Sequence, residues 1–181
     1  MPRLDPITSN SALSPQQQAA GDAVIKVFGR IRGPFSMLLH SPGLAERLLP
    51  MVTFVREDTI VGPANLRFAA ILTAAREREA AYVWAAQVEQ AHKHGVRKEL
   101  VDLIRAKGDP GALPQDEREI VNYVRQLMRN NRADTATFDA LKAKYSAQWL
   151  VELTAIVQFF GFVSGICNAF EVPPPENGDR F

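Results

Sequence analysis

A long apolar segment near the carboxyl end most constrains how this chain can fold. After Ser146, apolar side chains recur at three- and four-residue spacing from Leu150 to Phe170, which predicts a helix. They cover so much of its surface that we expect this helix at the centre of a helical domain or in a subunit interface. Such a helix needs other helices to pack against it.

The rest of the chain supplies such helices. Ser14-Pro15 and Ser41-Pro42 are typical helix starts, with serine as the N-cap and proline at the first helical position. No stretch alternates apolar and polar residues long enough to predict a strand. We therefore predict an all-α fold with one domain over residues 15–172, an N-terminal arm (1–14) and a C-terminal tail (173–181). The predicted helices start after Ser14, Ser41, Pro63 and Ala80, cover 98–106, 115–129 and 135–144, and end with the segment after Ser146.

Composition narrows the possible partners and chemistry. The 21 basic and 20 acidic residues give a net charge of +1, so neither nucleic acid nor a membrane surface is expected as a partner. The single cysteine, Cys167, cannot form a disulfide within the chain. We expect neither a signal peptide nor a membrane-spanning segment, and we predict a cytoplasmic protein. His92 and His94 would diverge around a helix without completing a ligand set, so we predict no metal and no cofactor.

Three segments, taken in order, resemble the carboxymuconolactone decarboxylase superfamily, which includes the alkylhydroperoxidase-D-like proteins. They are residues 38–42 with the following helix, the central helix pair in residues 66–96, and residues 150–154. The resemblance covers roughly residues 35–172. It implies an all-helical domain that forms homo-oligomers, commonly trimers or hexamers, with a small site in the central helix pair.

The same resemblance implies that the chemically active positions of the family are altered here. The family's first acidic position falls on Phe68, and its second acidic or resolving-cysteine position falls on Val83. The histidine position falls on Gln87, and the other redox cysteine falls on Ala80. None of these residues has a thiol or a proton that titrates near neutral pH. Peroxidase chemistry is therefore disfavoured.

Gln87 is the leading candidate for a site residue. It shares a helix face with Val83 and Trp84, so its amide lies beside an apolar stripe, where it either bonds within the protein or orients a ligand. His40 either caps or packs the helix that follows it, or transfers a proton. We predict Gln87 and His40 as catalytic candidates. The predicted substrate-binding residues are Phe68, Ala80, Val83, Trp84, Tyr82 and Arg67.

Structural roles stay open for several of these residues. Trp84 either packs in the core or orients a ligand through its indole N–H, and Tyr82 packs or faces an interface if it is not in the site. Arg67 either forks a carboxylate or lies at the surface. The charges of residues 77–79 predict a solvated helix junction, and Cys167 is expected to be a core residue.

The leading functional hypothesis is a cofactor-independent, non-redox enzyme acting on a small organic acid or lactone. It would be a decarboxylase, a lyase or a lactone-converting enzyme. An alternative is a non-catalytic ligand-binding or scaffold descendant of the family. A third is a thiol-dependent peroxidase using Cys167, which the missing cysteine pair disfavours.

Overall fold

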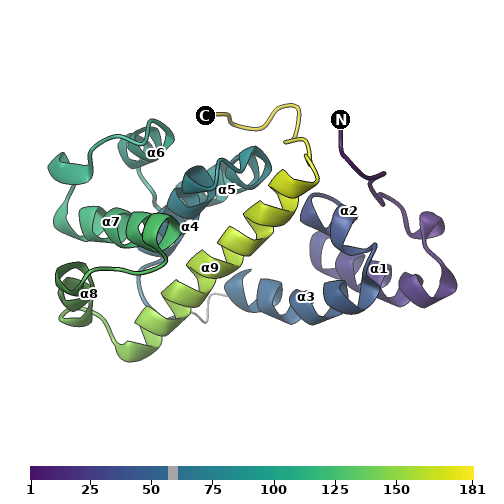
Figure 1. The fold of residues 1–181 in the computed structure, drawn as a ribbon, viewed down its shortest axis with the longest axis horizontal. Helices are drawn as coiled ribbons and strands as arrows, with labels where there is room; N and C mark the ends of the chain where they lie inside the picture. Colours follow the sequence, from purple (N-terminus) through teal and green to yellow (C-terminus); the bar gives the residue numbers. More distant parts are fainter. Residues whose placement is uncertain (57–60) are drawn as a thin grey trace. The chain divides into compact units, whose positions relative to one another are not determined.

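The computed structural model describes residues 1–56 and 61–181 (Figure 1). All regular secondary structure in these residues is helical, which confirms the all-α prediction. The helices are α1 (Pro15–Phe28), α2 (Pro34–Leu38), α3 (Pro42–Arg56), α4 (Ala64–Glu77), α5 (Ala81–Lys93), α6 (Lys98–Arg105), α7 (Gln115–Asn130), α8 (Thr135–Lys142) and α9 (Ala147–Ala169), with short 3-10 helices η1 (Asn10–Ala12) and η2 (Pro110–Ala112).

Short polar residues start several helices as predicted. The Ser14 amide donates to Gln17 Oε1 at 2.9 Å in a capping box that opens α1. Asp134 caps α8 by accepting from the Thr137 amide at 2.7 Å. At α9, the Trp149 amide donates to Ser146 Oγ at 3.2 Å. Helix starts were therefore readable from local side-chain chemistry.

The sequence analysis did not predict α2. This helix has five residues, too few to show a helical period. It starts after Gly33, whose φ is 59°, and Pro34 stands at its first position. The Ser36 hydroxyl donates to the Gly33 carbonyl at 2.7 Å. A glycine conformation and a local hydrogen bond therefore define a turn that periodicity could not reveal.

The chain divides into two compact units. One comprises Met1–Ile60 with Ile166–Pro173, and the other comprises Val61–Gly165 with Pro174–Phe181. In the second unit, α4 packs against α5, α6 and α7, and every residue from 66 to 75 is buried. The centre of this unit is therefore α4. The domain boundaries drawn from the sequence stay a prediction.

The N-terminal arm is anchored within the first unit. The Arg3 amide donates to the Phe170 carbonyl at 3.0 Å, and Arg3 Nη2 lies 2.8 Å from Glu171 Oε1. In the same unit, α1 packs along α3. The predicted surface arm thus has defined backbone and side-chain partners.

Helix α9 has the length and composition of a membrane-spanning helix, although no membrane-spanning segment was expected. Only 44% of its most apolar 18-residue window is buried in this chain. Core helices of globular proteins share this composition, so the feature is weak support for a membrane span. The cytoplasmic location stays a prediction.

The sequence suggested that Glu77 lies in a solvated junction, but the structure buries its side chain. Its side chain is only 5% exposed, and its carboxylate accepts from Arg129 Nε and Nη2, each at 2.7 Å. Arg125 Nε lies 3.4 Å from the same carboxylate. Burial lowers the pKa of the Arg125 guanidinium, and the charge of Glu77 opposes this effect. The end of α4 is therefore joined to α7 through the buried Glu77 carboxylate, which pairs with the buried Arg125 and the half-exposed Arg129.

Gly62 provides a test of packing at the start of the second unit. Its φ is 106°, and a Cβ built on it would lie 2.0 Å from Trp149 Cδ1 and Nε1. We expect Gly62→Ala to lower the free energy of unfolding by about 1–3 kcal/mol, because it adds both backbone strain and overpacking. Chemical denaturation measures this change.

Gly165→Ala is the matched control. Gly165 lies in α9, and a Cβ built there meets no atom within 4 Å. We expect this replacement to raise the free energy of unfolding by about 0.5–1 kcal/mol, because alanine favours a helix over glycine. The same loss in both variants would contradict the role given to the Trp149 contact.

Candidate functional site

The predicted site residues of the central pair lie on α4 and α5, which pack against each other. Phe68 is 8% exposed, Val83 is 3% exposed, and Ala80 and Trp84 are fully buried. Ala80 is the N-cap of α5, and its amide donates to the Ala75 carbonyl at 2.9 Å. We call Phe68, Ala80, Val83 and Trp84 the apolar wall. These buried residues can shape a site and keep water out of it, but they have no group that transfers a proton.

Gln87 is partly exposed and follows Val83 by one helical turn on α5. Its amide therefore belongs to the same side of the helix as the buried wall residues and retains access to solvent. Tyr82 is also partly exposed. Arg67 is only 4% exposed, and its Cζ lies 5.3 Å from the centre of the Phe68 ring. A surface role for Arg67 is thus wrong, because its side chain is buried beside the wall.

His94 is a site candidate that the sequence analysis considered only as a metal ligand. Its ring stacks on Phe68 with centroids 4.1 Å apart and planes 19° apart. His94 Nδ1 lies 2.8 Å from the Gln90 carbonyl. A carbonyl only accepts, so Nδ1 carries the proton in this bond, and Nε2 of the neutral ring is an acceptor. The sequence could have indicated that His94 shares a helix face with Gln87, because the two are seven residues apart. Nothing in the sequence indicated the contact with Phe68.

His40 belongs to the first unit, at the turn between α2 and α3. It is exposed, and its Nε2 lies 3.0 Å from the Asp5 carbonyl. This contact ties the ring to the backbone of the N-terminal arm. A proton-transfer role for His40 stays a prediction.

Cys167 is a core residue, 2% exposed. Burial raises the pKa of its thiol to about 12. About one molecule in 10⁵ would then carry the thiolate at pH 7, and the thiolate is the reactive form. The position and the protonation of this sulfur both oppose a role as nucleophile.

The C-terminal tail contacts Trp84, which the sequence did not predict. Trp84 Nε1 donates to Asp179 Oδ1 at 2.8 Å, across 95 positions in the chain. Arg105 Nη2 donates to Asp179 Oδ1 and Oδ2 at 3.0 and 2.9 Å. Burial lowers the pKa of Arg105, but the hydrogen bonds and charges of Asp179 and Asp102 together outweigh this effect and raise it. Phe181 meets the Trp84 ring edge-on, with centroids 5.6 Å apart.

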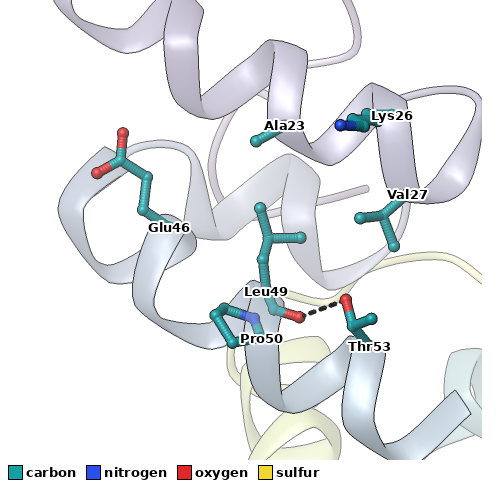
Figure 2. Close-up of a pocket in the computed structure, with 7 residues that line it drawn as sticks. All are labelled: Ala23, Lys26, Val27, Glu46, Leu49, Pro50 and Thr53. Carbon is teal, nitrogen blue, oxygen red and sulfur yellow. Dashed lines mark hydrogen bonds between the residues drawn. The ribbon is translucent and has the colours of Figure 1, made fainter. Parts of the chain in front are cut away.

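An open groove of about 500 Å³ lies in the first unit, between α1 and α3 (Figure 2). The Thr53 hydroxyl in it donates to the Leu49 carbonyl at 3.0 Å. Lys26 and Glu46 supply the charges at its edges, and the remaining lining is mostly apolar. The groove offers apolar contact rather than an arrangement for catalysis. Its lining residues are Ala23, Lys26, Val27, Glu46, Leu49, Pro50 and Thr53.

Within residues 1–56 and 61–181, no group of three or more histidine, cysteine or acidic side chains is placed to hold a metal ion. The absence of a cofactor stays a prediction.

No family model matches the sequence, and no curated protein matches it either. Solved structures do match. An alkylhydroperoxidase AhpD core protein from Ralstonia eutropha JMP134, described as an uncharacterized peroxidase-related protein, has a TM-score of 0.73 at 15% identity, covering 96% of this chain and 95% of that one. A peroxidase-related protein from Silicibacter sp. TM1040 has a TM-score of 0.72 at 10% identity, covering 97% and 94%.

A third solved structure is the debrominase Bmp8, in a cysteine-to-alanine variant bound to 2,3,4-tribromopyrrole. Its TM-score is 0.69 at 18% identity, and the match covers 97% of this chain and 95% of that chain. At these identities the likeness concerns the fold. It confirms what the sequence resemblance implied about architecture: this chain has the fold of the alkylhydroperoxidase-D-like proteins.

Proposed function

We propose that this chain is a cofactor-independent, non-redox enzyme of the carboxymuconolactone decarboxylase-like type, acting on a small organic acid or lactone. The observation that carries the proposal is the Gln87 amide beside the buried apolar wall, where Ala80 and Val83 supply no sulfur. An amide donates through its NH₂ group and accepts through its carbonyl, so Gln87 can orient a carboxylate or a lactone carbonyl.

Gln87 would act on charge that develops during the reaction. When a carboxyl group leaves as CO₂ or a lactone opens, negative charge grows on a substrate oxygen, and a positioned N–H stabilises it. A substrate that covers the partly exposed Gln87 amide against Val83 and Trp84 would exclude water from it, which strengthens such a hydrogen bond. The carbon that loses CO₂ must receive a proton from a titratable group. His94, which stacks on Phe68 in the same unit as Gln87, is the candidate when its Nε2 carries a proton.

The neighbouring structures support a small cyclic ligand. The Bmp8 variant was crystallised with 2,3,4-tribromopyrrole, a single substituted ring. A lactone acid is of similar size, and the apolar wall suits the face of such a ring. We therefore place the substrate among small cyclic organic acids.

A non-catalytic ligand binder or scaffold is the second candidate. It is favoured by the replacement of every expected proton-transfer group on the wall by a residue without a titrating proton. The Trp84 N–H is also bonded already, to Asp179. Turnover separates the two candidates, since both predict binding.

We also propose that the chain forms homo-oligomers, trimers or hexamers, in the cytoplasm. Helix α9 exposes apolar side chains that its own unit does not cover: Val151 is 68% exposed and Phe162 is 41% exposed. Ala155 is also exposed, and the partly exposed Phe159 lies on the same face. An apolar helix face of this kind is typical of a subunit interface.

Gln87→Ala tests the catalytic proposal. With a panel of small lactones and β-keto acids, we expect kcat/KM to fall by about 10²–10³-fold, because an oriented N–H donor is lost. Glu89→Ala is the control on the same helix, since Glu89 is exposed and pairs with Lys93. Steady-state assays report both variants. No turnover by the unaltered protein on any member of the panel would favour the non-catalytic candidate.

Phe162→Glu tests the oligomer. We expect a smaller particle mass by light scattering coupled to size exclusion, because the charge would be buried in the interface. Phe138→Glu is the matched control, since Phe138 on α8 is also 41% exposed. If neither substitution changes the particle mass, α9 is not part of a subunit interface.

Cys167 tests the redox alternative. We expect the native thiol to resist disulfide reagents at pH 7–8 and to react once urea unfolds the chain, because the buried sulfur holds its proton. Peroxide consumption that disappears in Cys167→Ser would instead support the peroxidase.

The same thiol predicts a pH dependence of stability. Its pKa is raised from 9.0 to about 12 by burial, so the unfolded thiol ionises first as pH rises. The free energy of unfolding should therefore fall between pH 9 and pH 12, by up to about 1.4 kcal/mol per pH unit from this group. Urea unfolding across this range measures the slope, and Cys167→Ala should have a shallower one.

A further inference from the structure

We propose that Trp84 and Arg105 form a carboxylate-binding site, continued by an aromatic slot over Arg76, for an aryl carboxylic acid. In the structure, Asp179 and Phe181 of the tail occupy this site. The inference deepens the proposed function, and it rests on that proposal for the choice of α5 as the ligand-facing helix.

Two donors converge on the Asp179 carboxylate. The Trp84 indole N–H approaches Oδ1 at 2.8 Å, while Arg105 Nη2 reaches both oxygens at 3.0 and 2.9 Å. Trp84 is fully buried, and a buried N–H needs an acceptor. Arg105 adds a positive charge, which favours an ionised acceptor over a neutral one. The chemistry of this pair therefore selects a carboxylate.

Helix α5 and the end of α4 hold an aromatic ring next to this carboxylate. Phe181 meets Trp84 at an interplanar angle of 89°, and Arg76 Cζ lies 4.3 Å from the centre of the Phe181 ring. Arg76 Nε also donates to the Arg105 carbonyl at 2.7 Å, so the cation under the ring is tied to the residue that binds the carboxylate. A ligand with both a ring and a carboxylate would satisfy both parts.

The tail has the properties of an exchangeable occupant. Residues 174–181 form no helix, and Glu176 and Asn177 are exposed. Gly178 allows the approach to α5, because a Cβ built there would lie 2.7 Å from Ala85 Cβ. Segments with exposed backbone and few packed side chains open at a lower cost than the core. Opening would leave the Trp84 N–H and Arg105 without this acceptor, and a free carboxylate would replace it.

A free acid must compete for this site with Asp179, which is held nearby by the chain. Because Asp179 is joined to the site by a short segment, its effective concentration is in the millimolar range or above. A free acid should therefore bind weakly to the unaltered chain. It should bind more tightly when the tail loses its charge.

The test follows the indole N–H resonances of the full chain labelled with ¹⁵N-tryptophan. The probe is 3-phenylpropionate, titrated into the unaltered protein and into Asp179→Asn. We expect Asp179→Asn to bind it at least about tenfold more tightly, because a charge-assisted competitor is removed. The Trp84 resonance should move, while the Trp149 resonance should not. Acetate, which lacks the ring, should bind more weakly, and 3-phenylpropionamide, which lacks the charge, should not bind.

Glu176→Gln is the matched control, since it removes an exposed carboxylate of the same tail. The Glu176→Gln variant should bind 3-phenylpropionate as the unaltered chain does. The double variant Arg105→Gln with Asp179→Asn should not bind it. Phe181→Ala is a second tail variant, expected to tighten binding in the same direction if Asp179→Asn does not fold. Equal affinity of the tail variants and the unaltered protein, or equal binding of the amide, would overturn the proposal. Glu89→Ala, at an exposed residue of the same helix, should leave the titration unchanged. The titration measures binding and not turnover, so a failed titration and failed turnover are separate results.

Discussion

The burial of α4 is the constraint on which the second unit depends. Its residues 66–75 are all buried, and α5, α6 and α7 pack around it. Alanines at 69, 70, 74 and 75 let these neighbours approach closely, because a methyl group keeps little distance between helices. The buried residues of α4 and α5 are therefore held in a close-packed core, and a polar group buried there needs a defined partner.

This packing explains the charged residues around the candidate site. Glu77 at the end of α4 is buried against α7 and is bound by Arg129. Arg76 donates to the Arg105 carbonyl and lies under the Phe181 ring. Arg67 is buried beside Phe68. Glu77, which was expected at a solvated junction, is instead built into the packing between helices, and so are Arg67 and Arg76.

The chemical character of the fold changes with the residues on the wall. The solved neighbours include peroxidase-related proteins and a debrominase, so one architecture accommodates different side-chain chemistry. Here the wall residues Phe68 and Val83 are apolar and buried, and Cys167 keeps its proton. This arrangement is the basis for proposing that the Gln87 amide bonds to a substrate oxygen, in place of thiol chemistry.

The sequence by itself determined the helical architecture. Helical period and local caps such as Ser14 and Asp134 depend on neighbours within a few residues, and they placed the long helices. Only the tertiary structure decided that His94 stacks on Phe68 and that Asp179 bonds to Trp84. The reason is the distance along the chain over which each interaction acts. Capping and periodicity act within one or two helical turns. These contacts join residues that packing brings together, and no spacing in the sequence indicates them.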